Sequence, residues 1–172
     1  KLGRHARAYV ASVDDFAQCE AMMGAAVADF GHVDVLVNNA GNASRGLTVA
    51  DTDPAELERT VGTHAFGAWS CSKLVLPSMR TRARGDIVMI SSAATVHMAS
   101  NSAPYNMAQA ALEALAATLA KEDRRHGIHV DIVPPGMVAT VLGHRTVEGA
   151  MGGLAIRHTL AGAATGQVGA PR

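Results

Sequence analysis

Three short apolar runs, separated by long helical patterns, constrain the fold of this chain more than any other feature. The runs lie at residues 33–37, 87–90 and 128–133, and the first two are nearly continuous rather than alternating with polar residues. Continuous apolar strands are typical of a parallel sheet with helices on both faces. Strands and helices that alternate along a chain in this way predict an α/β domain with right-handed crossovers.

The first part of the chain reads as a strand, a helix and a strand. Residues 6–11 are expected to form a short strand, and Asp14 and Asp15 then begin a helix that ends at Gly31. Apolar side chains recur in that helix at the three-and-four spacing of one buried face. They are Phe16, Cys19, Met22, Met23, Ala26, Val27 and Phe30. The unit leads directly into the apolar strand at 33–37.

Two longer helices are expected in the middle of the chain. Asp53 as N-cap and Pro54 in the first turn begin one helix, which is expected to run to about Arg80. The other helix carries alanine and leucine on one face and precedes the last apolar run. Small residues at 62–68 and 108–120 let a neighbouring helix approach closely. We therefore expect these two helices to pack against another subunit in a homo-oligomer.

The length, charge and cysteine content narrow the class of protein. A chain of 172 residues is sufficient for one domain with a real core. Fifteen basic and fifteen acidic residues leave no net charge, which gives no support to a nucleic-acid or membrane-surface partner. No apolar run is long enough to span a bilayer. Cys19 and Cys71 both fall in helical patterns, as expected for the reduced thiols of a cytoplasmic protein.

Three histidines in the second half of the chain suggest a metal site at first sight. His126, His129 and His144 fall across a helix end, a strand and the tail, without a cysteine or carboxylate at ligand spacing. We favour surface histidines at these positions and expect no metal site.

Hydroxyl side chains follow the second apolar run, at the point where open α/β sheets hold their ligands. Ser92 comes directly after the strand, and Tyr105 lies thirteen residues further on. Gln109 is one helical turn beyond Tyr105 and therefore on the same helix face. A serine hydroxyl and a phenol brought together in this way can polarise a carbonyl and pass it a proton.

Three short motifs occur in a characteristic order along the chain. Asn38-Asn39-Ala40-Gly41 follows a strand, Ser92 is followed by Tyr105, and Pro135-Gly136 is followed by Thr140. In this order and spacing the motifs resemble the short-chain dehydrogenase/reductase family, and the resemblance covers nearly the whole chain. It implies a Rossmann-like, doubly wound and mostly parallel sheet. It also implies NAD or NADP as cofactor and a small-molecule alcohol or ketone as substrate.

The resemblance implies a catalytic set of four residues, of which this chain matches two. Tyr105 would donate a proton to the substrate carbonyl, and Ser92 would position that carbonyl. His64 stands where the family has an asparagine that holds a water in the proton relay. Gln109 stands in place of the lysine that lowers the pKa of the tyrosine and holds the nicotinamide ribose.

The two replacements change the chemistry expected of the site. A phenol has an ordinary pKa of about 10, so Tyr105 without a cation beside it should stay neutral and be a poor base near pH 7. Gln109 can donate a hydrogen bond but carries no charge. His64 could exchange a proton near neutral pH. The interpretation that we favour is a histidine that fills the place of the asparagine between helices.

The resemblance also implies a cofactor site that is half matched. Ser12 replaces an aspartate or asparagine near the adenine, and Asp131 stands where an asparagine is common. The positions assigned to cofactor binding are Val13, Asn39, Ala40, Gly41, Tyr105, Val138 and Thr140.

A glycine-rich turn between a first strand and a helix, which a dinucleotide-binding fold needs, does not occur in the 172 residues. We therefore expect a single partial domain over 1–172, an incomplete sheet, and a flexible substrate loop and tail over 141–172. The strand at 6–11 would lack its neighbours, and the strand at 33–37 would have a bare edge. Such a chain is expected to be marginally stable or self-associating.

Two functions remain open from the sequence. The first is an oxidoreductase that interconverts a hydroxyl and a carbonyl with a nicotinamide cofactor. The second is a catalytically inactive relative that acts as a binding or oligomerisation module. The replacements at His64 and Gln109 favour the second function for the chain as it stands.

Overall fold

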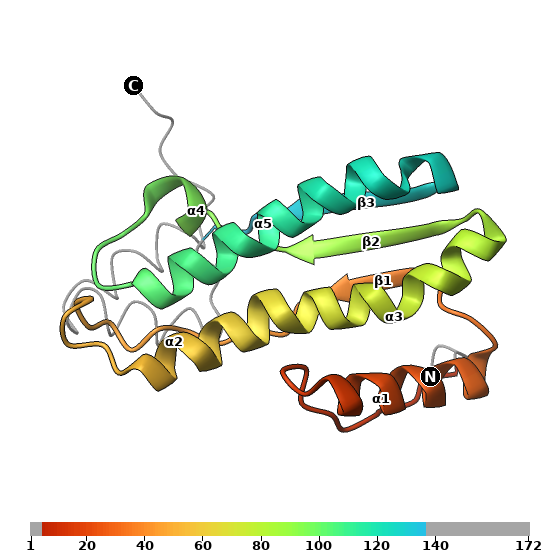
Figure 1. Cartoon of the computed structure of the whole chain (residues 1–172), viewed down its shortest axis with the longest axis horizontal. Helices are drawn as coiled ribbons and strands as arrows, with labels where there is room; N and C mark the ends of the chain where they lie inside the picture. Colours follow the sequence, from red (N-terminus) through yellow and green to blue (C-terminus); the bar gives the residue numbers. More distant parts are fainter. Residues whose placement is uncertain (1–4, 137–172) are drawn as a thin grey trace.

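The computed structural model describes residues 5–136, which contain a small parallel sheet and its helices (Figure 1). The expected loop and tail at 141–172 lie outside the described residues. In chain order the elements are α1 (Phe16–Phe30), β1 (Val35–Asn38), α2 (Pro54–Val61), the π-helical turn η1 (Gly62–Phe66), α3 (Gly67–Arg82), β2 (Gly85–Ile90), α4 (Ala94–His97), α5 (Ala103–Asp123), the 3-10 turn η2 (Arg124–His126) and β3 (Ile128–Val133).

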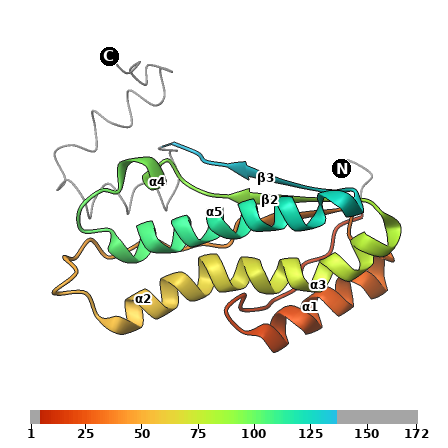
Figure 2. The same cartoon turned by 45° about the horizontal axis from the view of Figure 1, so that its top comes forward.

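The sheet has the strand order β1-β2-β3, and both pairings are parallel. Helices α3 and α5 lie against one face of it, and α1 lies beside α3, on the side of α3 away from α5 (Figure 2). Within the described residues the opposite face has no helix, so Val35 and Val37 of β1 are 53% and 54% exposed. The expectation of helices on both faces is therefore not met by this part of the chain.

The core lies between β2 and the inner faces of α3 and α5. It is built from aliphatic and methionine side chains, as the scarcity of aromatic residues requires. Its fully or almost fully buried members include Val75, Met79, Ile87, Met89, Leu112, Ala116 and Ile128. Two of the largest fully buried side chains, Met79 and Met89, are methionines, a residue type that adapts to irregular spaces.

The expected strand at residues 6–11 is wrong for this structure. These residues form no ladder hydrogen bonds, and Val10 is fully exposed. A strand needs the backbone of a neighbour, and the described sheet ends at β1. The segment is tied instead by its side chains, since the Tyr9 hydroxyl donates to Asp29 at 2.6 Å.

Helix α1 has the expected boundaries but buries less of its apolar face than its pattern suggests. Asp15 caps its first turn by accepting from the backbone of Ala17, and Gly31 ends it with a positive φ of 86°. Cys19 is fully buried, whereas Phe16 and Phe30 at the two ends of the helix remain exposed. Contact with α3 alone does not cover the whole face.

The long helix expected from Asp53 to about Arg80 is confirmed, but it is interrupted. Asp53 caps the start, and its side chain accepts from Ala55 N at 2.9 Å. The turn η1 then replaces one α-helical turn, and its last backbone bond runs from Gly67 N–H to the Gly62 carbonyl five residues earlier. π-helical turns of this kind are frequent at functional sites. Among residues 5–136 no helix is long and apolar enough to cross a membrane.

Candidate functional site

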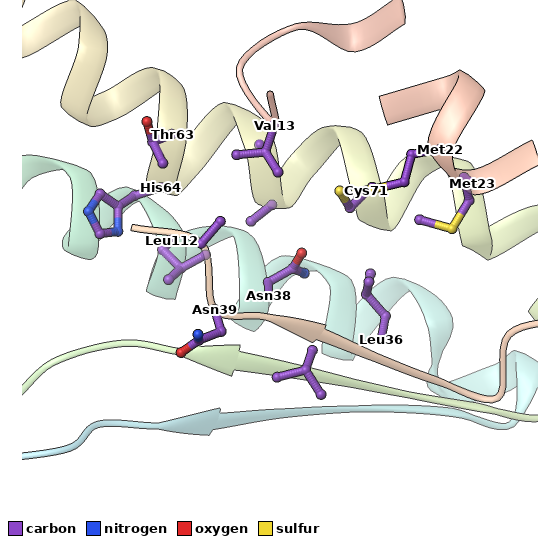
Figure 3. Close-up of a pocket in the computed structure, with 14 residues that line it drawn as sticks. Val13, Met22, Met23, Leu36, Asn38, Asn39, Thr63, His64, Cys71 and Leu112 are labelled. Carbon is purple, nitrogen blue, oxygen red and sulfur yellow. The ribbon is translucent and has the colours of Figure 1, made fainter. Parts of the chain in front are cut away.

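A pocket of about 140 Å³ lies where β1 ends, between the helices that cover the sheet (Figure 3). Asn38 and Asn39 line it from the strand end, and Val13 lines it from the segment before α1. His64 lines the pocket from η1, and Leu112 lines it from α5. The pocket therefore lies at the carboxyl edge of a parallel sheet, which is where such folds bind ligands.

His64 joins η1 to the loop that follows β1. Its Nε2 atom lies 3.0 Å from the backbone nitrogen of Asn42 and 2.9 Å from the Asn42 carbonyl oxygen. The side chain of Asn42 also donates to Thr63 Oγ1 at 2.8 Å. A Cβ atom at Gly41 would lie 2.5 Å from the imidazole Cε1 of His64, so the ring requires a glycine there.

The imidazole of His64 is only 5% exposed. Burial lowers its pKa below the ordinary value, and the nearby charge of Arg59 acts in the same direction. The hydrogen bond to Asn42 opposes this shift but is a smaller effect than burial. His64 is therefore neutral at pH 7.

Tyr105 and Gln109 lie one turn apart on α5 and contact each other and His64. Gln109 Nε2 donates to the Tyr105 hydroxyl oxygen at 3.1 Å, and the same nitrogen makes a longer contact of 3.5 Å with His64 Nδ1. The rings of His64 and Tyr105 meet edge to face, with centroids 5.4 Å apart. Gln109 is 2% exposed, and its Oε1 atom has no hydrogen-bond partner among residues 5–136.

Ser92 lies apart from this cluster. Its Oγ atom accepts from Ala94 N at 3.1 Å, and no hydrogen bond joins it to Tyr105 in the described structure. The neighbouring Ser91 hydroxyl is bonded to the Glu113 carboxylate on α5, and Thr95 donates to the same carboxylate at 2.9 Å. Glu113 thus ties the residues on both sides of Ser92 to the helix that carries Tyr105.

The sequence-predicted cofactor positions fall into two groups. Val13, Asn39 and Ala40 share the pocket, and Gly41 lies against His64 at its edge. Val13 packs so closely on α3 that a Cβ atom at Gly67 would lie 2.8 Å from its Cγ2 atom. Val138 and Thr140 lie outside the described residues.

Glu56 is a buried residue of the site region that the sequence analysis did not assign to the site. Its carboxylate accepts from Ser44 Oγ at 2.9 Å and from Arg45 N at 2.6 Å, so it holds the loop after β1 against α2. The available signal was a carboxylate on the inward face of the helix, which needs a partner when it is buried.

The two cysteines are free thiols that face each other from α1 and α3. Both are buried. Burial, and to a lesser extent the neighbouring Cys19, raises the pKa of Cys71 to about 12. A thiol with so high a pKa is a poor nucleophile, which favours a packing role for Cys71.

The histidines outside the site have partners of their own. His129 Nδ1 lies 3.3 Å from Asp86, and His126 accepts from Arg125 Nε at 3.2 Å. His144 lies outside the described residues. Over residues 5–136 no group of three or more potential ligands is arranged to hold a metal ion.

Comparison with known proteins gives consistent results. The family model described as short chain dehydrogenase matches residues 1–150. A 1,6-dihydroxycyclohexa-2,4-diene-1-carboxylate dehydrogenase of Acinetobacter baylyi is 34% identical over 137 residues, which cover 78% of this chain and 51% of that protein. The chain spans about half the length of the curated relatives that it matches.

Solved structures agree with the sequence relatives. The structure of NAD+-bound xylitol dehydrogenase superposes with a TM-score of 0.81 at 31% identity, over 85% of this chain and 56% of that one. A gluconate 5-dehydrogenase from Burkholderia cenocepacia in complex with NADP and tartrate gives a TM-score of 0.75 at 26% identity, over 80% of this chain and 53% of that one. These matches confirm the expected Rossmann-like α/β fold with a parallel sheet, which is small and partial here.

Proposed function

Because the chain belongs to the short-chain dehydrogenase family, we propose that it is part of an oxidoreductase that interconverts a hydroxyl and a carbonyl with a nicotinamide cofactor. One observation carries the proposal: Tyr105, Gln109 and His64 meet at the carboxyl edge of the parallel sheet, beside a pocket bordered by the Asn39 turn. The substrate that fits this chemistry is a small-molecule alcohol or ketone.

A nicotinamide cofactor fits the polar groups that the site leaves open. Gln109 Oε1 is a buried acceptor without a partner among the described residues, and a ribose hydroxyl is a suitable donor for it. Asn39 and Ala40 border the pocket and are open to solvent, so their backbone and side-chain groups can meet a ligand. The two structural relatives hold NAD+ and NADP respectively, and the cofactor proposed here is one of these two.

When bound, the cofactor supplies the hydride, and Tyr105 supplies the proton. The Tyr105 oxygen already accepts a hydrogen bond from Gln109, so its own hydrogen is free to point to a substrate carbonyl. Ser92 would hold the other side of that carbonyl from the end of β2. To do so, its hydroxyl must donate to the substrate while it continues to accept from Ala94 N.

The replacement of a cation by Gln109 favours one direction of the reaction. Reduction of a carbonyl needs a neutral Tyr105 that donates its proton, whereas oxidation of an alcohol needs its anion as base. Among the described residues the hydrogen-bond donor to the Tyr105 hydroxyl oxygen is the uncharged Gln109 amide, and no cation contacts this oxygen. We expect the site to support carbonyl reduction better than alcohol oxidation.

The alternative of an inactive binding module gains no support from the comparisons, since the relatives described above are dehydrogenases. Self-association remains compatible with activity. Phe66 and Trp69 are exposed on the outer side of η1 and α3, and we propose that this side faces another subunit in a homo-oligomer. Sedimentation of the purified protein at two concentrations tests this assembly.

The first experiment is a titration of the protein with NADH and with NADPH, followed by the fluorescence of the bound nicotinamide. Saturation in the micromolar range supports the cofactor site, and the preferred cofactor can then be used with a panel of ketones. Absence of binding at millimolar concentration of both cofactors contradicts the proposal. Gln109→Leu, which keeps the volume and removes the acceptor, should weaken binding about tenfold if Oε1 accepts from the ribose.

A further inference from the structure

We propose that His64 sets the orientation of the Gln109 carboxamide, and through it the direction of the Tyr105 hydroxyl, and that protonation of His64 reverses both. His64 is then a positioning residue that makes the site sensitive to pH. The inference rests on the proposed function only where it treats Tyr105 as the proton donor. The exchange of hydrogen bonds concerns this chain's own residues.

The contacts of neutral His64 define the first state. The Gln109 amide nitrogen carries two hydrogens, one directed to Tyr105 at 3.1 Å and one to His64 Nδ1 at 3.5 Å. Nδ1 can accept only if the imidazole proton is on Nε2, where the Asn42 carbonyl oxygen lies at 2.9 Å to receive it. In this state the Tyr105 hydrogen is free, and Gln109 Oε1 is an unused acceptor.

Protonation removes the acceptor on which this arrangement depends. A doubly protonated imidazole presents an N–H from Nδ1, and that N–H repels the N–H of the Gln109 amide. A half-turn of the carboxamide places Oε1 between the two rings. There it accepts from His64 Nδ1–H and from the Tyr105 hydroxyl. The Tyr105 hydrogen is then engaged, and the amide nitrogen takes the place that Oε1 had.

The surroundings of His64 allow this exchange without movement of the ring. The ring is held against Gly41, where no Cβ would fit. The Asn42 carbonyl oxygen accepts from Nε2–H in both protonation states, so it holds the imidazole in place throughout. Only the Nδ1 side changes its hydrogen-bonding character, and Gln109 is the residue on that side.

The charges around His64 place the exchange in acidic solution. The titratable or charged groups that face it in the described residues are Arg59 on α2 and Tyr105 on α5, and the loop after β1 presents only backbone. No carboxylate of this part of the chain acts on the pKa of His64, which burial and Arg59 hold below its ordinary value. The first state is therefore the populated one at pH 7, and the second becomes populated only when the pH falls below the lowered pKa of His64.

The side-chain amide of Gln109 reports the exchange directly in NMR spectra of the ¹⁵N-labelled protein. Between pH 7.5 and pH 5 its two hydrogens should lose their cross-relaxation with the Tyr105 ring, with the same midpoint as the His64 imidazole nitrogens. In His64→Asn the transition should vanish. The matched control His129→Asn removes an exposed histidine at the opposite end of the sheet and should leave the transition unchanged.

A functional measurement then separates the inference from the proposed function. Carbonyl reduction at saturating substrate should fall about tenfold per pH unit below the midpoint in the wild type, and not in His64→Asn. If the Gln109 signals stay constant while His64 titrates, or if they change equally in His64→Asn, the inference is wrong whatever the activity. A protein that shows the exchange but binds neither NADH nor NADPH would contradict the proposed function and support the inference.

Discussion

The two ends of the helical layer hold their buried polar groups in different ways. At the end away from the site, Asp123 is fully buried, and both of its oxygens accept from Arg80, at 2.6 and 3.1 Å. At the site end, five buried polar atoms lack a hydrogen-bond partner among the described residues. They are Asn42 Oδ1, Glu56 Oε2, Thr60 Oγ1, Asn106 Oδ1 and Gln109 Oε1.

This difference separates stability from function along the same pair of helices. Buried polar groups are normally satisfied, and unsatisfied ones need an explanation such as a ligand or a mobile partner. The satisfied pair joins α3 to the end of α5 and so fixes the distance between the two helices. The unsatisfied atoms surround the loop after β1 and the start of α5, where a cofactor and a substrate would bring donors. Four predictions test this division.

The largest effect should come from Tyr105→Phe, which removes the proton donor but keeps the ring. Carbonyl reduction should fall by about 10²–10⁴-fold, the usual contribution of a general acid, while the melting temperature stays nearly the same. Steady-state kinetics and calorimetry of the same preparation measure both. The control is Tyr9→Phe, since Tyr9 bonds only to the exposed Asp29. Equal activity of the two variants would exclude Tyr105 as the donor.

A stability effect without an activity effect is expected from Arg80→Ala. It leaves the Asp123 carboxylate buried without its partner, and the free energy of unfolding should fall by about 2 kcal/mol, less than for a fully buried pair because Arg80 is partly exposed. Urea denaturation at pH 7 measures the loss. Arg82→Ala breaks the more exposed pair with Asp34 and should cost about 0.5 kcal/mol. Equal losses would show that burial of Asp123 is unimportant.

The close approach of Gly41 to His64 predicts a third result at the site end. Gly41→Ala forces the imidazole or the loop to shift, and the free energy of unfolding should fall by about 1–3 kcal/mol. The His64 imidazole signals should move with it. Gly24→Ala is the matched comparison, because Gly24 lies within α1 with open space around it. The free energy of unfolding of this variant should rise by about 0.5–1 kcal/mol. If both substitutions raised the free energy of unfolding, the packing at Gly41 would be loose.

The smallest effect concerns stability in acid. The pKa of His64 is lower in the folded chain than the ordinary value that applies when it is unfolded, because burial disfavours the charged form. Well above pH 6.5 His64 is neutral in both the folded and the unfolded protein, so it does not change the free energy of unfolding. As the pH falls from about 6.5 through the lower pKa of the folded protein, the unfolded protein binds more protons, and the free energy of unfolding decreases. The difference between the free energies of unfolding at pH 7.5 and pH 5 should therefore be smaller in His64→Asn than in the wild type or in His129→Asn.

Local patterns predicted the elements that depend on neighbours in sequence. The three apolar runs became β1, β2 and β3, and the cap at Asp53 and the stop at Gly31 are where the sequence places them. The segment at 6–11 failed because a strand depends on a partner that no local pattern reveals. The interruption at η1 was also missed, because no local pattern in the sequence marks it.

The site was predictable in its members but not in their contacts. The spacing of Tyr105 and Gln109 placed them on one helix face, and their hydrogen bond follows from it. The contact between Gln109 and His64 joins residues 45 positions apart. It depends on the distance between two helices, which no spacing in the sequence encodes. His64 was expected to fill space, and its bonds to Asn42 give it a more specific task.

The turn η1 has a consequence for how the long helix could change through evolution. A residue inserted into an α-helix rotates everything after it by roughly 100°, so α2 and α3 are two segments whose inward faces are out of phase by one residue. The inward face of α2 carries Glu56 to the loop, and that of α3 carries Val75 to the core. Deletion of one residue from Gly62–Phe66 would give a more regular helix. Such a helix could keep either the contact of Glu56 with the loop or the contact of Val75 with the core, but not both.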